Sequence, residues 1–588
     1  MQGNLVNSLK QAETFATYLA HSHWKAPAEH YKGATTPIST PTPVNMQPIT
    51  VQELKSILTK VKNNKAPGPD LLPAEAFKWL EEDNLHILQQ TLNLVLLHRT
   101  IPTEWQVANV IEIYKGKGAH TDPEMYRPIS LLSTAYKILA RILQTRLAEV
   151  LDHKLRPTQY GFRKNRSCSQ PLHIVRRLQD KAEKTGATLY LMFLDWEKAF
   201  DKIHPEALIA SLRRCGVTED FVEMIINIYS QPLFTVTAAG TTSQVEKAQT
   251  GIRQGCPLSP YLFLVVHSAI MHDVEQLMQQ NDQLLPWVHS ANHPLFDLAY
   301  ADDTVLMGQS AAVVERALHH VQNTAQQYNL KLNLAKCEYM SMNAISNNIT
   351  FTDGTQVKRK QQVKYLGAIL TADARSTPDV RARIAKATAG LEKLNKFWQH
   401  TDIDTAWKIK IYIAVFIPMI LYGMESAHLT PQNLQQLDTF HYKAMRKIYK
   451  IKTTYYTQVI NPAAHTYKNK DIEAMSNIPP LSQTALSLQF KFLGHILRCS
   501  STDLEQNICF TSGFASRAQD SSQRRGRPRE HWLEGVSLKA WEQFCSTPPC
   551  PRVMPQFHLP MGFLQLHRIA TDRVQWRQLV VLPPTSRA

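Results

Sequence analysis

The chain has 588 residues, of which 44% are hydrophobic, so it is too long for one compact core and too apolar to be disordered throughout. Its length corresponds to roughly three to four domains. Its 65 lysines and arginines against 49 aspartates and glutamates give a net charge of +16, which favours a polyanionic partner, nucleic acid ahead of a membrane surface, with a merely soluble basic protein as the alternative.

Residues 1–48 are expected to be an N-terminal segment and a linker, because their later part is rich in threonine and proline. The first folded element should then begin near Ile49 as a helix. Thr50 is its expected N-cap, and Glu53, three residues later, would complete a capping box. From there to about residue 185 the apolar spacing is mostly helical.

The pattern changes at residues 188–194, a continuous run of apolar and β-prone side chains that ends at Asp195. Such a run is typical of a buried strand. A second block, residues 295–307, is strand-like on both sides of Asp302 and Asp303. Because aspartates favour turns, this block predicts a tight hairpin with two carboxylates at its tip.

Asp195, Asp302 and Asp303 therefore lie at the ends of predicted strands. If these carboxylates converge, their charges repel one another, and divalent cations relieve the repulsion. Mg²⁺ fits because it takes hard oxygen ligands, and two such ions about 3.5–4 Å apart can promote phosphoryl transfer, with Mn²⁺ as an alternative ion. Convergence is an assumption at this point, because a solvated turn is the ordinary explanation of a single aspartate pair.

After about residue 370 the chain is helical again. Residues 381–470 hold 14 lysines and arginines against 5 aspartates and glutamates. Within this stretch Lys443, Lys447 and Lys450 fall on one face of a predicted helix, away from its apolar face. A lysine stripe of this kind is usually a solvated surface, so it indicates binding of nucleic acid only together with other signals.

The tail after about residue 510 is rich in proline, serine, glutamine and arginine, and we expect it to be loosely packed. Its sequence at 525–528 resembles an AT-hook core, but a flexible basic tail is the favoured interpretation. Eight cysteines without a Cys-x-x-Cys pair suit a reducing compartment. The amino end lacks a secretory signal, and the most apolar run, residues 411–422, is too short to span a bilayer. We expect an intracellular protein of the cytoplasm or nucleus without a membrane partner.

Eight short motifs follow one another along the chain. They are KAPGPD (65–70), YRPIS (126–130), QYGFR (159–163), FLDWEKAFD (193–201), GIRQGCPLSP (251–260), AYADDT (299–304), LNLAK (332–336) and KYLG (364–367). Their order and spacing resemble the reverse transcriptase of non-LTR (LINE-type) retrotransposons. The resemblance covers about residues 50–370 and continues more weakly to about residue 535.

The resemblance implies an α+β fold in the form of a right-hand polymerase. Helical fingers are expected at 49–187, an antiparallel-sheet palm with the YADD hairpin at 188–370, and a helical thumb at 371–455. A helical, partly disordered extension with a basic tail would occupy 456–588. The implied activity is RNA-directed DNA synthesis, in which two metal ions promote extension of a primer 3′-hydroxyl by deoxynucleoside triphosphates. The implied partners are an RNA template and a DNA primer or target.

The resemblance also implies roles for single residues. It makes Asp195, Asp302 and Asp303 the metal ligands and Lys336 the general acid toward pyrophosphate, with a solvated lysine as the alternative. Asp201 is expected to be structural. The further expected roles are nucleotide binding by Arg127, Arg163, Phe200 (the steric gate against ribonucleotides), Gln254 and Gly255, a primer grip formed by Tyr365, Leu366 and Gly367, and duplex binding by Lys443, Lys447 and Lys450.

Two alternatives come from other functional classes. A catalytically silent relative could hold RNA or DNA without copying it, although the intact acidic residues and Phe200 favour an enzyme. A splicing cofactor of the maturase kind would need a splicing domain after the thumb, and none is recognised. Residues 1–48 are too few for an endonuclease domain, so we expect a separate endonuclease to nick the target.

Overall fold

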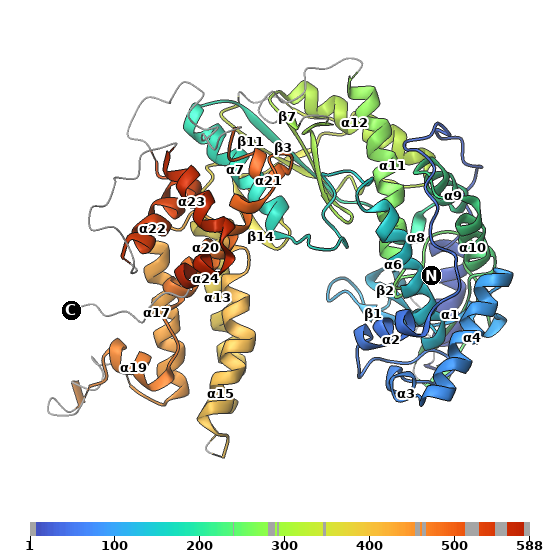
Figure 1. Ribbon diagram of the computed structural model, residues 1–588, viewed down its shortest axis with the longest axis horizontal. Coiled ribbons are helices and arrows are strands. Elements are labelled where there is room, and N and C mark those ends of the chain that lie inside the picture. Colours follow the sequence, from blue (N-terminus) through green and yellow to red (C-terminus); the bar gives the residue numbers. More distant parts are fainter. Residues whose placement is uncertain are drawn as a thin grey trace.

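The computed structural model describes residues 8–238, 240–279, 289–290, 293–344, 348–400, 402–452, 459–460, 466–511, 529–546 and 561–580. The chain forms an arch (Figure 1). Its N-terminal half makes one arm, its C-terminal helices make the other, and a central sheet with two long helices joins them. The predicted α+β fold class is confirmed.

The central sheet has the strand order β12-β11-β3-β10-β9. Its strands are antiparallel except for the β11–β12 pair. Both predicted features are present: every residue of β3 is buried, and β9 and β10 form a hairpin in which Tyr300 pairs with Asp303. The strands are β3 (Leu189–Leu194), β9 (Asp297–Tyr300), β10 (Asp303–Gly308), β11 (Glu338–Met342) and β12 (Lys358–Arg359).

The helices around this sheet bring the motif segments together. The longest is α11, whose side chains are mostly buried. α7 packs against β3, β9 and β11, and α12 packs against β3 and β10. These helices are α7 (Ser169–Thr185), α8 (Ala199–Lys202), α9 (Pro205–Arg214), α10 (Glu219–Ser230), α11 (Ser259–Gln279) and α12 (Ala311–Gln327).

The N-terminal arm contains a second sheet, which corrects the mostly helical prediction for this region. β1 pairs antiparallel with β2 and parallel with β4, which comes more than a hundred residues later. The sheet consists of β1 (Val107–Tyr114), β2 (Tyr126–Leu131), β4 (Leu233–Ala238), β5 (Thr241–Thr242) and β6 (Glu246–Lys247). The helices beside it are α2 (Val51–Lys60), α3 (Ala74–Lys78), α4 (Glu82–His98), α5 (Thr103–Gln106) and α6 (Thr134–Leu151).

The N-cap predicted for α2 is present, but the reciprocal bond of the predicted capping box is not. The Thr50 side chain accepts a hydrogen bond from the backbone N–H of Glu53, as an N-cap should. The Glu53 carboxylate, however, does not return to Thr50. It pairs with the buried guanidinium of Arg146 at 2.7 Å, because a buried cation needs a counter-charge more than the helix needs a second cap.

The N-terminal segment is a folded part of this arm, so the prediction that folding begins near Ile49 is wrong. Helix α1 (Ser8–Tyr18) packs against β4 and is followed by a π-helical turn (Leu19–His23), and Phe15 and Trp24 enter the main hydrophobic core. The threonine- and proline-rich stretch then runs along α9, where the Ile38 N–H donates to the Arg214 carbonyl at 2.7 Å.

The C-terminal arm is helical, and the apolar face predicted for the helix that carries Lys443 and Lys447 is confirmed by burial of Leu437, Ala444 and Ile448. None of the described helices is long and apolar enough to cross a membrane. Its elements are a hairpin, β13 (Gln362–Tyr365) and β14 (Ala368–Thr371), followed by α13 (Thr377–Lys393), α14 (Asn395–Gln399), α15 (Thr405–Ile411), a π-turn (Tyr412–Phe416), α16 (Ile417–Leu421) and α17 (Pro431–Ile448).

The remaining helices show that the described part of the tail after residue 510, at 529–546 and 561–580, is packed rather than loose. A continuous core runs from the central sheet through α7 to Phe490, Leu493 and Trp532. The 525–528 sequence lies outside the described residues. The helices are α19 (Asn469–Ser476), α20 (Leu481–Arg498), α21 (Leu504–Asn507), α22 (Trp532–Ser546), α23 (Met561–Thr571) and α24 (Arg573–Val580).

Candidate active site

A cavity of about 850 Å³ opens beside the hairpin of the central sheet. Segments that are distant in sequence line it: β2, the α8 region, the loop before α11 and the turn before β11. Six of the predicted site residues are among its lining residues: Arg127, Phe200, Gln254, Gly255, Asp302 and Lys336.

The three predicted metal ligands are electrostatically coupled. Asp302 and Asp303 lie at the hairpin tip, and Asp195 directly follows β3, which pairs with β10. Desolvation raises the pKa of Asp303 to about 6, with repulsion from Asp302 and Asp195 adding to it. Desolvation and Asp195 also raise the pKa of Asp302. The convergence that the sequence could only assume is therefore present.

The donor set fits a divalent cation, because hard carboxylate oxygens that repel one another favour such an ion between them. In this structure the counter-ion of Asp195 is Lys336, whose ammonium lies 2.9 Å from its Oδ1. Within the described residues, no three acidic, histidine or cysteine side chains are already grouped for metal binding. A cation bound by Asp195 would therefore have to compete with the Lys336 ammonium.

A buried hydrogen-bond network supports the hairpin from behind. Gln159 donates to the Ala301 carbonyl at 3.1 Å and accepts from the Ala301 N–H at 2.9 Å. Its amide also lies 3.3 Å from His267 Nδ1, whose other nitrogen lies 3.1 Å from Thr304 Oγ1. Thr304 in turn accepts from the indole N–H of Trp196 at 3.2 Å. The turn therefore depends on side chains from three other segments.

The donors fix the tautomer of His267. The Gln159 N–H₂ can only donate to Nδ1, so Nε2 carries the hydrogen and donates to Thr304. Desolvation lowers the pKa of His267 to about 3, which keeps the ring neutral. The network also holds Ala301 at a φ of 58°, a left-handed conformation that is costly for a residue with a Cβ. Sequence analysis missed His267, whose only signal is a polar residue inside the apolar helix α11.

Phe200 is held at a defined angle in the cavity wall. Its ring stacks on Phe263 with centroids 4.8 Å apart and planes at 15°, and Phe162 meets it edge-on at 6.4 Å. Gly255 is needed for packing: a Cβ there would lie 2.4 Å from the Ser130 carbonyl oxygen, and its φ of 119° favours glycine. The loop that carries Gln254 can therefore approach β2 closely.

The two predicted phosphate-binding arginines differ. Arg127 is exposed on β2 and lines the cavity. Arg163 is buried, and its guanidinium donates to the Asp152 carboxylate at 3.0 Å and to the carbonyls of Arg156 and Gln159, both at 2.9 Å. With its donors used inside the protein, Arg163 is a structural residue, and its predicted role in nucleotide binding is corrected.

The predicted primer grip is the turn between β13 and β14. Tyr365 is buried, with its ring 5.6 Å from that of Phe193. Leu366 and Gly367 both have positive φ, at 45° and 80°. The Leu366 carbonyl accepts from the Tyr422 hydroxyl at 2.9 Å. The turn backbone, rather than the tyrosine side chain, is therefore the part available to a ligand.

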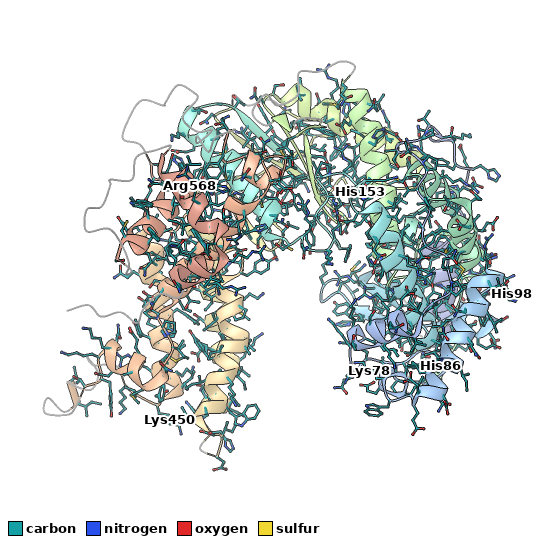
Figure 2. The ribbon with its side chains drawn as sticks, in the orientation of Figure 1. Lys78, His86, His98, His153, Lys450 and Arg568 are labelled. Carbon is teal, nitrogen blue, oxygen red and sulfur yellow. The ribbon has the colours of Figure 1, made fainter. Side chains whose placement is uncertain are left out.

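The three thumb lysines do not form one free stripe. Lys443 is exposed, but Lys447 pairs with Glu392 at 2.7 Å, and Lys450 lies beyond the end of α17 at a φ of 58°. Figure 1 shows α13 and α15 along the edge of this arm that faces the N-terminal arm, with α17 on the side away from that arm. Figure 2 places Lys450 near the arm's free end. Exposed basic residues on α13 are Arg381, Lys386 and Lys393.

Residues 114–370 match the family described as reverse transcriptase (RNA-dependent DNA polymerase). This part of the chain is therefore similar to a reverse transcriptase domain. It is 24% identical over 517 residues to the RNA-directed DNA polymerase from mobile element jockey of Drosophila melanogaster, an alignment that covers 83% of this chain and 51% of the relative. For the jockey polymerase of Drosophila funebris the identity is 27% over 466 residues, covering 75% and 49%.

The similarity to LINE-type reverse transcriptases is thus confirmed, and the chain spans about half the length of the jockey relatives it matches. Among solved structures, the RNA-dependent RNA polymerase of a human picorbirnavirus, as an insertion-loop deletion mutant, aligns with this chain at a TM-score of 0.40 and 13% identity. That alignment covers 81% of this chain and 82% of the viral one.

Proposed function

We propose that this chain is the RNA-directed DNA polymerase of a non-LTR retrotransposon and extends a primer 3′-hydroxyl with deoxynucleotides on an RNA template. One observation carries the proposal: Asp302, Phe200 and Gln254, which come from separate motifs, line the same cavity. A catalytically silent relative would have no reason to keep mutually repelling carboxylates beside an aromatic wall, because their repulsion destabilises the fold.

The chemistry needs positioning and charge neutralisation more than a reactive side chain. Two Mg²⁺ ions, or Mn²⁺ in their place, would be held by Asp195, Asp302 and Asp303 and would activate the attacking oxygen and stabilise the leaving one. Arg127 supplies a planar donor set at the mouth of the cavity, suited to phosphate oxygens. Lys336 holds an ammonium proton next to Asp195 that it could donate to pyrophosphate.

We propose the same regions for the fingers, palm and thumb as the motifs indicate, with one change. The fingers take in residues 8–48 as well as 49–187, since α1 packs on β4. The palm is 188–370, the thumb is 371–455, and the extension that follows is part of the palm's core. Free thiols at Cys168, Cys215, Cys256, Cys337, Cys499 and Cys509 fit a place of action inside the cell, in the cytoplasm or nucleus.

Primer extension tests the proposal directly. We expect the purified chain to extend an annealed DNA primer on an RNA template in Mg²⁺, and to stop when the metal is chelated. Running the same primer on a DNA template of identical sequence measures the template preference. Binding of the template–primer without extension on either template, in Mg²⁺ or Mn²⁺, would instead favour the silent binding protein.

The thumb provides a second test, in which two sets of three residues are compared. Replacing Arg381, Lys386 and Lys393 of α13 with glutamine should lower the slope of log affinity against log salt by about 2–3, since each lost phosphate contact contributes about 0.7–0.9. Replacing Lys443, Lys447 and Lys450 should change it less, because Lys447 is already paired with Glu392. Fluorescence anisotropy with a labelled RNA–DNA duplex measures both slopes. A larger change from the α17 set would assign duplex binding to that helix instead.

A further inference from the structure

Asp201 has a denser set of polar contacts than a structural residue at a helix end requires. Its side chain is buried, and its Oδ1 accepts from the indole N–H of Trp24 at 3.0 Å. Its Oδ2 accepts from the side-chain amide of Gln254 at 2.6 Å, and His23 Nε2 lies 3.2 Å from the same oxygen. One carboxylate thus joins the N-terminal segment to the loop that lines the catalytic cavity.

The contact determines which way the Gln254 amide faces. A carboxylate can only accept hydrogen bonds, so the Gln254 N–H₂ must point toward Asp201. The amide oxygen then lies on the other side, and it has no hydrogen-bond partner within the described part of the chain. Because Gln254 lines the cavity, this oxygen is an acceptor left for a ligand.

The backbone on both sides of this contact is fixed. The Gln254 carbonyl accepts from the Ser130 N–H of β2 at 2.7 Å. Ile252 N–H donates to the Phe200 carbonyl at 2.8 Å, and a Cβ at Gly251 would lie 2.5 Å from the Asp201 carbonyl oxygen. The short helix α8 therefore carries both Phe200 and Asp201, the amide of Gln254 is bonded to the Asp201 carboxylate, and all three residues line the cavity.

The N-terminal segment supports Asp201 on its inner side. Trp24 is buried, its ring meets Phe234 of β4 edge-on at 4.9 Å, and its carbonyl accepts from the Gln249 N–H at 3.0 Å. Its indole N–H can therefore reach Asp201 in only one direction. His23 is buried as well and contributes to the cavity wall.

We propose that Asp201 is a positioning residue that sets the polarity of Gln254, so that a carbonyl oxygen rather than an N–H₂ group faces a donor on the incoming nucleotide, and that residues 19–24 hold Asp201 in place for this purpose. The inference rests on the proposed polymerase function. It assigns a part in nucleotide binding to residues 19–24, which the sequence places ahead of the first expected folded element.

Substitutions that interchange carboxylate and amide groups at positions 201 and 254 test the proposal. In Asp201→Asn the new side chain can still accept from Trp24, but it then presents its N–H₂ to Gln254, whose amide must turn over and direct its own N–H₂ into the cavity. We expect the KM for deoxynucleotides to rise by about 10–100-fold, from one lost hydrogen bond and one unpaired donor. The kcat and the Mg²⁺ dependence should stay near those of the parent, since the carboxylates of the hairpin are untouched.

The rescue variant makes the test specific. Gln254→Glu alone places two carboxylates together and should also raise KM. In the double variant Asp201→Asn/Gln254→Glu the asparagine amide can donate to the glutamate, whose second oxygen again faces the cavity as an acceptor. We expect its KM to be lower than that of either single variant. Trp24→Phe, which removes the indole N–H and part of the ring volume but keeps an aromatic side chain, should raise KM in the same direction by a smaller factor.

Asp353→Asn, in an exposed turn, serves as the matched control, and thermal unfolding of each variant verifies that it is folded. A parent-like KM in folded Asp201→Asn would overturn the inference while leaving the polymerase function intact. A KM for the double variant that equals or exceeds that of the worse single variant would overturn it as well. Absence of primer extension by the parent chain itself would instead count against the proposed function.

Discussion

Replacing Asp302 with alanine should reduce deoxynucleotide incorporation by on the order of 10²–10³ or more, because one preorganised charge stabiliser at the reacting phosphate is lost. Asp195→Ala and Asp303→Ala should behave alike, since the three carboxylates interact with one another. Single-turnover primer extension at saturating nucleotide measures the loss. Template–primer affinity should change little.

The matched control is Asp353→Ala, which removes an exposed carboxylate from a surface turn and should leave incorporation unchanged. Near-normal extension by Asp302→Ala would exclude these aspartates as the metal ligands. A further distinction comes from metal dependence. If Lys336 competes with the cation at Asp195, Lys336→Met should lower the Mg²⁺ concentration needed for half-maximal activity, whatever it does to the maximal rate.

Variants that lose one of these mutually repelling carboxylates should be at least as stable as the parent, although they are inactive. Burial and neighbouring charges raise the pKa of Asp303 to about 6, above the ordinary value of 3.8. The folded chain therefore holds this proton more tightly than the unfolded chain, and its stability falls as the pH rises through this window. Without divalent metal, Asp303→Asn should raise the Tm at pH 7, and the difference should disappear below about pH 4.

Replacing Phe200 with alanine should admit ribonucleotides, reducing the preference for dNTP over rNTP by about 10–100-fold, the range in which a packed apolar wall rejects an added hydroxyl. The ring can act as a barrier because Phe263 and Phe162 fix its orientation. Ratios of kcat/KM for each nucleotide pair measure the change. Phe200→Tyr keeps the bulk and should keep the preference.

If Phe200→Ala lowers kcat/KM for dNTP and rNTP by the same factor, so that their ratio is unchanged, the ring supports the fold rather than the choice of sugar. Because Asp201 follows Phe200 directly, both variants should be compared with Asp201→Asn. The aromatic residue is expected to change selectivity between sugars, and the carboxylate to change the KM for both.

The features that could be predicted from sequence are those with local causes. The buried run at 188–194 and the aspartate-interrupted block at 295–307 each determine their own strand or turn within about a dozen residues, and both are present. The apolar spacing of α17 is of the same kind. These local signals located the hairpin and its carboxylates, and the motif order supplied the rest of the cavity wall.

The features that were missed depend on distant partners. β1 is a strand because β4, more than a hundred residues later, pairs with it. The local spacing of apolar residues in the sequence gives no indication of this pairing. Arg163 has the right residue type for phosphate, but its environment decides its role, since Asp152 and two carbonyls use its donors. Trp24 likewise becomes informative only when its contact with Asp201 is known.

The core that runs from the central sheet through α7 to the C-terminal helices has a consequence for synthesis of the chain. Arg166 and Gln170 of the α7 region reach Glu505, at 3.0 Å and 2.7 Å, and Arg177 lies over the Trp532 ring. All eight motifs leave the ribosome before these partners exist. One side of α7 therefore stays uncovered until these later helices have been synthesised, and a chain that ends ahead of α20 contains every motif but lacks part of this core.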